Sequence, residues 1–377
     1  MKEGWEYKKL GEVCNIDFGT RVVRSRDAGS IYPVYGGGGA TFKMDTYNRE
    51  DCMVISRFGM SEQCTRFVKG RFFLNDSGLT LSIKKHCMIQ NYMDWQILYL
   101  NNTIYSLGRG AAQKNLDTKA LAEIIIAYPN NLSEQQSIVD YLDSAFAKID
   151  AMKANSEKAL NEAKALFQAS LKEMLEPKEG WEEKTLKELT SKIGSGATPK
   201  GGRKVYIDKG CHLIRSMNVQ YNEFKYDDLA HITDEAAEQL KGVEIQENDV
   251  LFNITGASIA RCCVVPDDAL PARVNQHVSI LRLKQEVLPR FLSFIMNSPK
   301  HQRELLEIGE AGSTRQALTK TDLENHVICY PSLDNQNKLL ATLDSLKSKV
   351  DRLQENFDKI SQECDALKQA ILKQVFE

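Results

Sequence analysis

The stretch Lys2-Glu3-Gly4-Trp5-Glu6 recurs almost unchanged later in the chain as Lys178-Glu179-Gly180-Trp181-Glu182. Tryptophan occurs three times among the 377 residues, and two of the three lie in these matched phrases. Self-similarity at a long, fixed offset is typical of a structural unit that is used more than once. We therefore predict that the chain is an internal duplication.

A second matched pair closes each copy. Ala127-Tyr128-Pro129 precedes a polar, helix-forming run that contains Gln135, and Cys329-Tyr330-Pro331 precedes another that contains Gln336. The repeat unit is thus a globular module followed by a helix. The predicted segments are modules at residues 1–132 and 178–333 and helices at residues 133–177 and 334–377.

Length, composition and charge limit the class of protein. A chain of 377 residues, 42% of them hydrophobic, can bury the cores of two or three domains. No stretch approaches the roughly 18 consecutive apolar residues of a membrane helix, and the first residues do not resemble a signal peptide. We expect a cytoplasmic protein. The net charge of −2 argues against a non-specific coat for nucleic acid but permits DNA binding through local basic loops.

The nine cysteines are scattered along the chain. Their only close pair, Cys262-Cys263, is adjacent, which suits neither a C-x-x-C redox site nor a zinc knuckle. We expect them to be small buried residues in a reducing compartment.

The two helices carry a coiled-coil pattern. Ser133 is a good N-cap, and no glycine or proline follows until Pro177, which predicts one helix about 65 Å long. The second helix has apolar residues at the 3-4-3-4 spacing of a coiled coil: Leu343, Leu346, Val350, Leu353, Phe357, Ile360, Cys364, Leu367 and Ile371. The equivalent stripe of the first helix has smaller side chains: Leu142, Ala145, Ile149, Met152, Ser156, Ala159, Ala163, Leu166 and Ser170.

Chain connectivity predicts the direction of the helices. The first helix leaves module one and arrives at module two, and the second helix starts from module two, so the two pair antiparallel if they pack together. The alternative is that each helix dimerises with another copy of the chain. Leu160, Phe167 and Leu171 lie off the predicted stripe and suggest a further face that docks another protein.

The modules contain strand-like runs bounded by turn residues and short helical periods. Leu79-Thr80-Leu81-Ser82-Ile83 and Val278-Ser279-Ile280-Leu281 are examples of the first kind. The predicted fold class is α+β, with two mixed α/β domains, a long antiparallel two-helix coiled coil between them and a pseudo-two-fold internal repeat. Strand order does not follow from the sequence.

Motifs for catalysis and for cofactor binding are absent from the sequence. It has no G-x-x-x-x-G-K-[ST] phosphate loop and no [ND]-P-P-Y segment of an adenine methyltransferase. The six histidines are isolated along the chain and are predicted to be structural. We therefore expect no catalytic residues, no metal and no cofactor.

Basic and amide residues instead gather in loops beside glycine, serine and threonine. Arginine and lysine suit guanine edges and phosphates, and asparagine and glutamine suit adenine edges; the alternative is that each loop is simply solvated. The candidate DNA-contacting residues are Arg21, Arg24, Arg57, Arg66, Arg109, Gln113, Lys114, Lys200, Arg203, Lys204, Arg215, Asn218, Thr255, Ser258, Arg261, Asn275, Gln276, His277, Arg315 and Gln316.

The order of module and Tyr-Pro…Gln helix, used twice, resembles the specificity subunit of type I restriction–modification enzymes. Leu213–Asn218, Asp249–Arg261 and Ala272–Val278 are similar to that family's target-recognition domains, and Tyr32–Gly39 with Arg57-Phe58-Gly59 looks like another variety of the same domain. The resemblance implies a non-catalytic subunit whose two modules read the halves of a bipartite target in double-stranded DNA. It also implies two methyltransferase subunits and two restriction subunits as partners, with the helices setting the spacer.

Two other functions remain open at this stage. One is the recognition subunit of a related system whose methylase is fused in relatives. The other is a coiled-coil assembly scaffold without DNA affinity.

Overall fold

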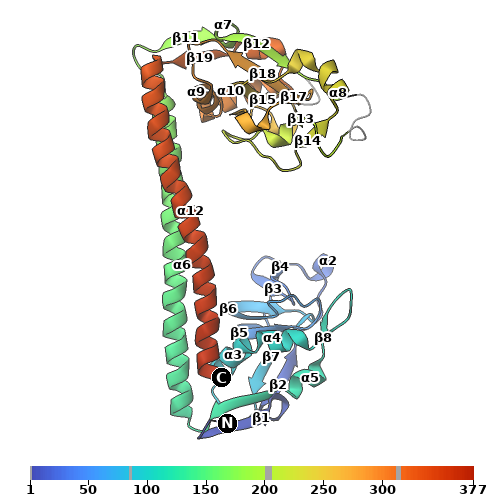
Figure 1. Ribbon diagram of the computed structural model, residues 1–377. Helices are drawn as coiled ribbons and strands as arrows, with labels where there is room; N and C mark the ends of the chain where they lie inside the picture. The colour runs from blue at the N-terminus through green and yellow to red at the C-terminus, as the bar shows by residue number, and fades with distance from the viewer. Residues whose placement is uncertain (1, 85–86, 200–205, 311–315) are drawn as a thin grey trace. The chain divides into compact units, whose positions relative to one another are not determined.

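The computed structural model describes residues 2–84, 87–199, 206–310 and 316–377 (Figure 1). The chain divides into two compact units, one formed by residues 1–158 with 355–377 and the other by residues 159–354. Each unit contains one module and parts of both long helices, so the repeat that the sequence predicts is visible in the structure. Among the described residues, every helix is too short or too polar to span a lipid bilayer.

The first module is built on a six-stranded sheet. Its strand order is β2 (Cys14–Phe18), β7 (Gly78–Ile83), β5 (Arg49–Ser56), β6 (Thr65–Leu74), β3 (Tyr32–Tyr35) and β4 (Ala40–Met44). All neighbours pair antiparallel except β3 and β6, which are parallel. Alternation along β5 separates two cores, since Met53 and Ile55 face the main core and Val54 faces a smaller one.

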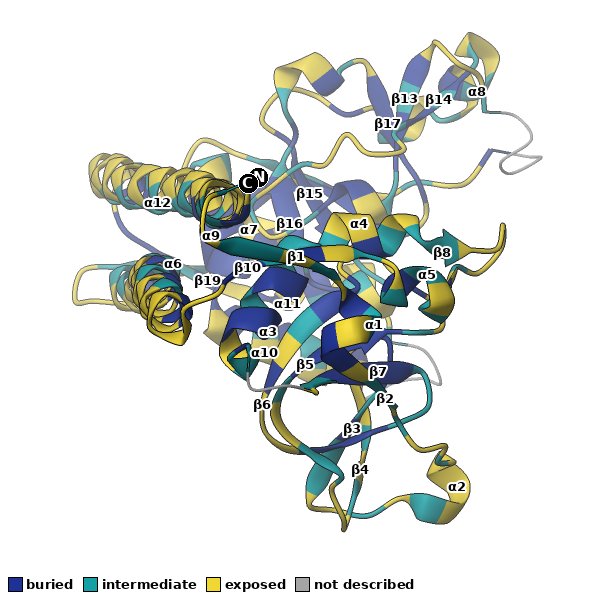
Figure 2. Cartoon of the chain, turned by 90° about the horizontal axis from the view of Figure 1, so that it is seen from below, coloured by how far each residue is buried: buried dark blue, intermediate teal, exposed yellow. Residues whose placement is uncertain are grey.

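Helices cover the main-core face of this sheet. The helix α3 (Gln90–Tyr99) contributes buried Tyr92, Met93 and Ile97 to that core (Figure 2). Strand β1 (Trp5–Lys9) pairs antiparallel with β10 (Ile125–Pro129), which brings the beginning and the end of the module together. The remaining short elements are α1 (Leu10–Val13), α2 (Arg24–Asp27), α4 (Asn101–Ser106), β8 (Gly108–Arg109), β9 (Asn115–Leu116) and α5 (Thr118–Ala122).

The second module repeats the first four strands of that order. Its larger sheet runs β12 (Thr190–Ser195), β18 (Val278–Leu283), β15 (Val250–Asn253) and β16 (Cys262–Val264), all antiparallel. A second sheet contains β14 (Ala230–Ile232), β13 (Cys211–Ile214) and β17 (Ala272–Val274). Strand β17 pairs parallel with β13, just as β6 pairs parallel with β3. One long strand in the first module therefore corresponds to two short ones in the second.

The other elements of the second module frame these sheets. Strand β11 (Glu182–Thr185) pairs antiparallel with β19 (Val327–Tyr330), as β1 pairs with β10. The helices are α7 (Leu186–Leu189), α8 (Asp234–Gln239), α9 (Pro289–Met296), α10 (Pro299–Glu310) and α11 (Lys320–Asn325). The described residues of this module also contain the short 3₁₀ turns η2 (Ser216–Asn218), η3 (Lys241–Val243), η4 (Gly256–Ser258) and η5 (Asp267–Ala269).

One buried glutamine joins each long helix to its module. The Gln135 amide donates to the carbonyls of Cys87 and Pro129, 2.9 and 2.8 Å away, and accepts from the Ile89 N–H at 2.9 Å. Gln336 makes the same three hydrogen bonds in the second module, to the carbonyls of Glu286 and Pro331 and from the N–H of Leu288. Both glutamines are fully buried. These are the glutamines of the repeated Tyr-Pro…Gln motif.

The long helices are α6 (Leu132–Leu175) and α12 (Leu333–Phe376), and the predicted ranges for them are residues 133–177 and 334–377. In the first unit, the thiol of Cys364 lies 3.8 Å from the carbonyl of Ile149, and Lys153 lies 3.4 Å from Asp365. In the second unit, Lys164 donates to Gln354 at 2.8 Å. Within the first unit, Lys368 lies 5.3 Å from the ring of Phe146 whereas Cys364 lies beside Ile149, so rising numbers in α6 meet falling numbers in α12. The helices of one chain therefore pair antiparallel, as the sequence predicts.

The predicted contact stripe of α6 is wrong at alternate positions. Met152 and Leu166 are 58% and 65% exposed, whereas Leu160 is only 4% exposed. Phe146 and Phe167, one residue after the predicted Ala145 and Leu166, pack into the two module cores. The predicted stripe and the observed stripe both repeat about every 3.5 residues. The observed stripe is adopted because it buries larger side chains and so removes more apolar surface from water.

The separate docking face predicted from Leu160, Phe167 and Leu171 is consequently also wrong. Leu160 and Leu171 are buried, and Phe167 and Leu171 belong to the core of the second module. Leu367 of α12, placed in the stripe by the sequence, is 48% exposed. Ser156 lies opposite Phe357 if the register of Ile149 and Cys364 continues for seven residues along both helices.

The end of each long helix completes the core of the other module. Leu372 and Phe376 at the end of α12 are buried in the first module, where the Phe376 ring lies 5.7 Å from that of Tyr92 and 5.4 Å from that of Tyr99. Leu171 and Leu175 at the end of α6 are buried in the second. Each long helix thus contributes side chains to the core of the module at its far end.

All nine cysteines are free thiols, six of them buried and three half-buried. Burial raises the pKa of Cys14 and of Cys263 to about 12 each. The thiols of these two residues stay protonated at neutral pH, which fits their predicted role as small interior residues.

We predict that Gln135→Glu and Gln336→Glu each destabilise the protein by about 3 kcal/mol, because an ionised carboxylate cannot donate to the two carbonyls that each glutamine contacts. Gln168→Glu, on an exposed position of α6, is the matched control and should leave the melting temperature unchanged. Hydrogen exchange should locate the loosening in α3 for Gln135→Glu and in α9 for Gln336→Glu. Equal melting temperatures for Gln135→Glu and Gln168→Glu would contradict this role.

Candidate nucleic-acid interface

Three loops meet in the same way in both modules. In the first, the N–H of Arg57 donates to Ser77 and the N–H of Leu116 donates to Arg57, both at 2.8 Å. In the second, the N–H of Ile254 donates to His277 at 3.0 Å, and the N–H of Leu318 donates to Ile254 at 2.8 Å. The loops follow β5 and β15, precede β7 and β18, and precede α5 and α11. Loops that the sequence predicts as separate candidates thus form one site in each module.

We call the place where these three loops meet the loop junction, and further backbone contacts at it also occur in both modules. The side chain of Asn75 accepts from the N–H of Ser77 at 2.9 Å, and Asn275 accepts from His277 at 3.0 Å. A glycine directly follows β2 and another directly follows β12, and each lies against the backbone of a loop in its own module. A Cβ on Gly19 would lie 1.9 Å from the carbonyl of Asn75, and one on Gly196 would lie 1.7 Å from that of Val274. No side chain fits there, so the backbone is closely packed.

The two modules present different side chains on this shared backbone. An isolated β-bridge joins Phe58 to Asn115 in the first module, and another joins Thr255 to Ala317 in the second. These two β-bridges establish which positions of the modules correspond. The resulting pairs of equivalent residues are Arg57 and Ile254, Phe58 and Thr255, Asp76 and Gln276, Ser77 and His277, and Lys114 and Gln316. The side chains therefore differ in chemistry between the modules at positions where the backbone makes the same contacts.

In the first module the site combines cations with aromatic rings. The guanidinium of Arg57 lies 4.7 Å from the ring of Phe18 and 4.5 Å from the ring of Phe58. Phe18 is 46% and Phe58 is 38% exposed, although neither was predicted as a site residue. Lys114 lies 3.8 Å above the ring of Tyr105. Such an array offers both charge and flat apolar surface to a ligand.

Other predicted residues of the first module lie around this array. Arg109 is exposed and pairs with Asp117 at 2.5 Å. The pKa of Asp117 lies below its usual value, first because its carboxylate accepts from the Ala120 N–H and then because of Arg109. Gln113 is exposed beside Gly59, Arg21 lies shortly after the end of β2, and Arg24 is exposed in α2.

Arg66 differs from these residues because it supports a neighbouring loop. Its guanidinium donates to the carbonyls of Gly37, at 2.8 Å, and of Gly38. Ser56 also donates to the Gly37 carbonyl, at 2.5 Å. The glycine-rich loop at residues 36–39 is therefore held against β5 and β6. We revise the prediction for Arg66 from a DNA contact to a positioning residue.

In the second module the site is a connected array of polar side chains. His277 lies 2.6 Å from the hydroxyl of Thr255 through Nδ1 and 3.0 Å from the amide of Gln276 through Nε2. Thr198, which the sequence did not single out, donates to Gln276. The backbone carbonyl of Gln316 accepts from the N–H of Gly256, and its side-chain amide donates to Glu310 at 2.8 Å.

Arg261 and Ser258 lie on the loop that begins with this array. The Arg261 guanidinium donates to Gln220 at 2.7 Å and lies 5.2 Å from the ring of Tyr221, which is 54% exposed. Ser258 is half-buried. Arginine and tyrosine here form a second pair of a cation with an exposed ring.

Three predicted contacts of the second module lie in its interior. Asn218 is fully buried and donates to the carbonyls of Lys225 and Asp227 while it accepts from the N–H of Arg215. Asn275 is 6% exposed and holds the turn described above. Arg215 has only 11% of its side chain exposed and pairs with Asp228 at 2.8 Å. We revise these three predictions, because these groups already bind within the protein.

Some predicted residues lie outside the described part of the chain. These are Lys200, Arg203, Lys204 and Arg315.

The histidines are isolated along the chain, but four of them lie in two pairs in the described part of the structure. His212 and His231 face each other across β13 and β14 with ring centroids 4.8 Å apart. His301 and His326 approach to 2.8 Å between Nδ1 and Nε2, although 25 residues separate them in the chain. Burial lowers the pKa of His301 to about 3 and that of His326 to about 4, so both rings are neutral at neutral pH.

Comparison with known proteins identifies the family. The chain matches the type I restriction modification DNA specificity domain over residues 2–162 and 178–362, and it belongs to this family. It is similar to the EcoBI specificity subunit of Escherichia coli, with 25% identity over 70% of this chain and 60% of that one. It is also similar to the EcoKI specificity subunit of Escherichia coli (strain K12), with 23% identity over 73% of this chain and 62% of that one.

The chain thus spans about 60% of the length of the curated relatives that it matches. Solved structures share the fold at low identity. A chain from a structural study of the assembly and conformational transition of the type I R-M system superposes with a TM-score of 0.73 at 16% identity, over 100% of this chain and 98% of that one. The HsdS subunit from Thermoanaerobacter tengcongensis gives a TM-score of 0.55 at 16% identity, over 100% and 97%.

We predict that Asn218→Ala lowers the stability of the second module by roughly 1–3 kcal/mol, since it leaves buried backbone groups without their partner. Gln276→Ala, at an exposed neighbouring site, should leave the melting temperature within about a degree because its contacts lie at the surface. Thermal denaturation of both variants measures the difference. The assignment of Asn218 to the interior fails if it melts like Gln276→Ala.

Proposed function

We propose that this chain is the DNA-recognition subunit of a type I restriction–modification assembly. Each module reads one half of a bipartite target in double-stranded DNA. The observation that carries the proposal is the loop junction that occurs twice with one backbone and two sets of side chains. A shared backbone suits the same task in both modules, and different side chains suit different base sequences.

The exposed residues at each junction have the chemistry of base and phosphate recognition. In the first module, Arg57 suits the O6 and N7 acceptors of guanine, and Arg21, Arg109 and Lys114 suit phosphates. In the second, Gln276 suits the N6 and N7 atoms of adenine and Arg261 suits guanine or phosphate. Gln113, Thr255, Ser258, His277 and Gln316 provide further hydrogen-bonding groups beside them.

The net charge of −2 implies that partners contribute to DNA binding. We propose two methyltransferase subunits and two restriction subunits, which carry out methylation and cleavage in the cytoplasm. The chain itself supplies recognition and no chemical step. The sequence has neither the phosphate loop nor the adenine methyltransferase segment that such reactions use.

The two long helices are proposed to set the spacer between the half-sites. Because the two helices pair through heptads, their length can change by whole heptads without loss of the pairing. Exposed apolar residues on them, including Met152 and Leu166, suit the docking of a methyltransferase subunit.

We expect Arg57→Ala and Gln276→Ala to relax recognition of different half-sites, since a bidentate base contact provides roughly 1–3 kcal/mol of discrimination. Methylome sequencing of cells that carry each variant in the assembled enzyme measures this. Arg352→Ala, at an exposed position of α12, is the control and should alter neither half-site. Relaxation of the same half-site by both variants would contradict the proposal, and a purified assembly without sequence-specific DNA binding would favour the scaffold alternative.

A seven-residue insertion at matched levels of both helices should lengthen the spacer. Insertion after Met152 and after Ile360 keeps the heptads in register, because Lys153 and Ile360 lie at one level of the antiparallel pair that Ile149 and Cys364 define. Seven residues add about 10 Å, which is up to about three base pairs at roughly 3.4 Å each. Methylome sequencing should show longer spacers with unchanged half-sites. An unchanged spacer in an active variant would show that the helices do not set it.

A further inference from the structure

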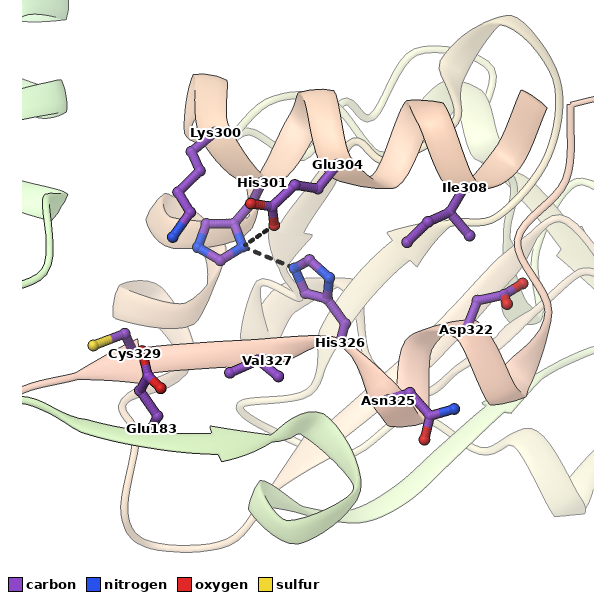
Figure 3. Close-up of a pocket in the computed structure, with 10 residues that line it drawn as sticks. All are labelled: Glu183, Lys300, His301, Glu304, Ile308, Asp322, Asn325, His326, Val327 and Cys329. Carbon is purple, nitrogen blue, oxygen red and sulfur yellow. Dashed lines mark hydrogen bonds and ion pairs between the residues drawn. The ribbon is translucent and has the colours of Figure 1, made fainter. Parts of the chain in front are cut away.

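A pocket of about 370 Å³ in the second module opens onto two histidines and a glutamate (Figure 3). His301 and Glu304 project from one face of α10, three residues apart. His326 lies between α11 and β19, on the opposite wall of the pocket. Segments distant in the sequence thus bring three side chains with metal-binding atoms to one place.

The distances between these atoms are close to those of a metal site. His301 Nδ1 lies 2.8 Å from His326 Nε2 and 3.8 Å from a carboxylate oxygen of Glu304, and the three groups lie within 4.8 Å of one another. Ligand atoms about 2.0–2.2 Å from a tetrahedral zinc ion lie roughly 3.3–3.5 Å apart. If the two imidazole rings moved slightly apart and the Glu304 carboxylate moved slightly closer, the three ligand atoms would have that spacing.

Both imidazoles are buried, with His301 7% and His326 6% exposed. Their short contact needs one proton between two nitrogens, so one ring donates and the other accepts. A metal ion in place of that proton lets both nitrogens act as lone-pair donors. The arrangement is thus compatible with an ion at the point where the two rings now share a proton.

The charges around the pocket favour a cation. The carboxylates of Glu183, Glu304 and Asp322 line it, and Lys300 is the one lysine or arginine among its lining residues. Three acidic groups against one basic group make the pocket negative when the histidines are neutral. Cys329 also lines the pocket, and its half-buried thiol is available on the same wall as His326.

We propose that His301, Glu304 and His326 bind one divalent transition-metal ion, with Zn²⁺ the best match. Two imidazoles and one carboxylate suit Zn²⁺, Co²⁺ or Ni²⁺, whereas Mg²⁺ and Ca²⁺ prefer oxygen ligands alone. This inference concerns a site away from the loop junction and does not depend on the proposed function.

The ion would fasten α10 to the start of β19. The carbonyl of Gly309, at the end of α10, accepts from the N–H of Ala317, and the adjacent Gln316 accepts from Gly256 at the loop junction. A fixed α10 therefore limits the movement of one of the junction loops. An ion that binds only the folded protein also raises its melting temperature.

The test uses the full chain, stripped with a chelator and titrated with Zn²⁺ and, separately, with Co²⁺. One ion should bind per chain and raise the melting temperature, and Co²⁺ should give the intense visible absorption of a tetrahedral site without a thiolate charge-transfer band. Glu304→Gln, at a half-exposed position that tolerates substitution, and His326→Gln should each weaken binding at least tenfold.

His231→Gln is the matched control, because it removes a member of the other histidine pair, for which the structure shows no third metal-binding group among the described residues. This variant should bind as the unaltered chain does. Absence of binding, or equal loss in His231→Gln and His326→Gln, would overturn the proposal. A thiolate band that persists in both variants would assign the ion to a cysteine instead.

Discussion

The structure depends on one repeated interaction, the burial of a glutamine at the start of each long helix. Gln135 and Gln336 each satisfy one backbone donor and two backbone acceptors in a place that water does not reach. A buried amide in such a position is stabilising only when all its partners are present. The direction in which each helix leaves its module is therefore held by hydrogen bonds as well as by packing. The antiparallel pairing of the helices follows from chain connectivity, because α6 leaves the first module and α12 leaves the second.

Each module separates the backbone of its site from the side chains that the site displays. The turn asparagines, the close-packed glycines and the bridges between loops repeat, so they provide the scaffold. Arg57, Gln276 and their neighbours differ between modules while the scaffold remains. Because the scaffold does not use these side chains, the surface residues can change without a change in the fold.

Much of the architecture follows from the sequence because it rests on periodicity and duplication. The bounds of both helices, their direction and the existence of two related modules are local or topological consequences of the chain. The stripe of α6 was predicted one residue out of phase at Phe146 and Leu160, since a spacing of three and one of four fit the pattern equally until the partner helix selects between them. The site residues are harder to predict, because a side chain must be exposed to contact DNA and its burial does not follow from the sequence. Asn218 and Arg66 have the right chemistry for DNA but are engaged by the fold, and the exposed rings of Phe18 and Phe58 have no signature in the sequence. The pairing of His301 with His326 depends on tertiary contacts alone.

The burial of Phe376 against Tyr92 and Tyr99 has a consequence for synthesis on the ribosome. A nascent chain normally folds its first domain before the later ones emerge. Here the first module to emerge lacks Leu372 and Phe376 until α12 has been synthesised, so it must wait with part of its apolar core open to solvent. A chain that stops before the last turn of α12 never closes that core, which leaves it exposed to proteases and chaperones. The last turn of α12 thus distinguishes a first module with a complete core from one whose core is still open.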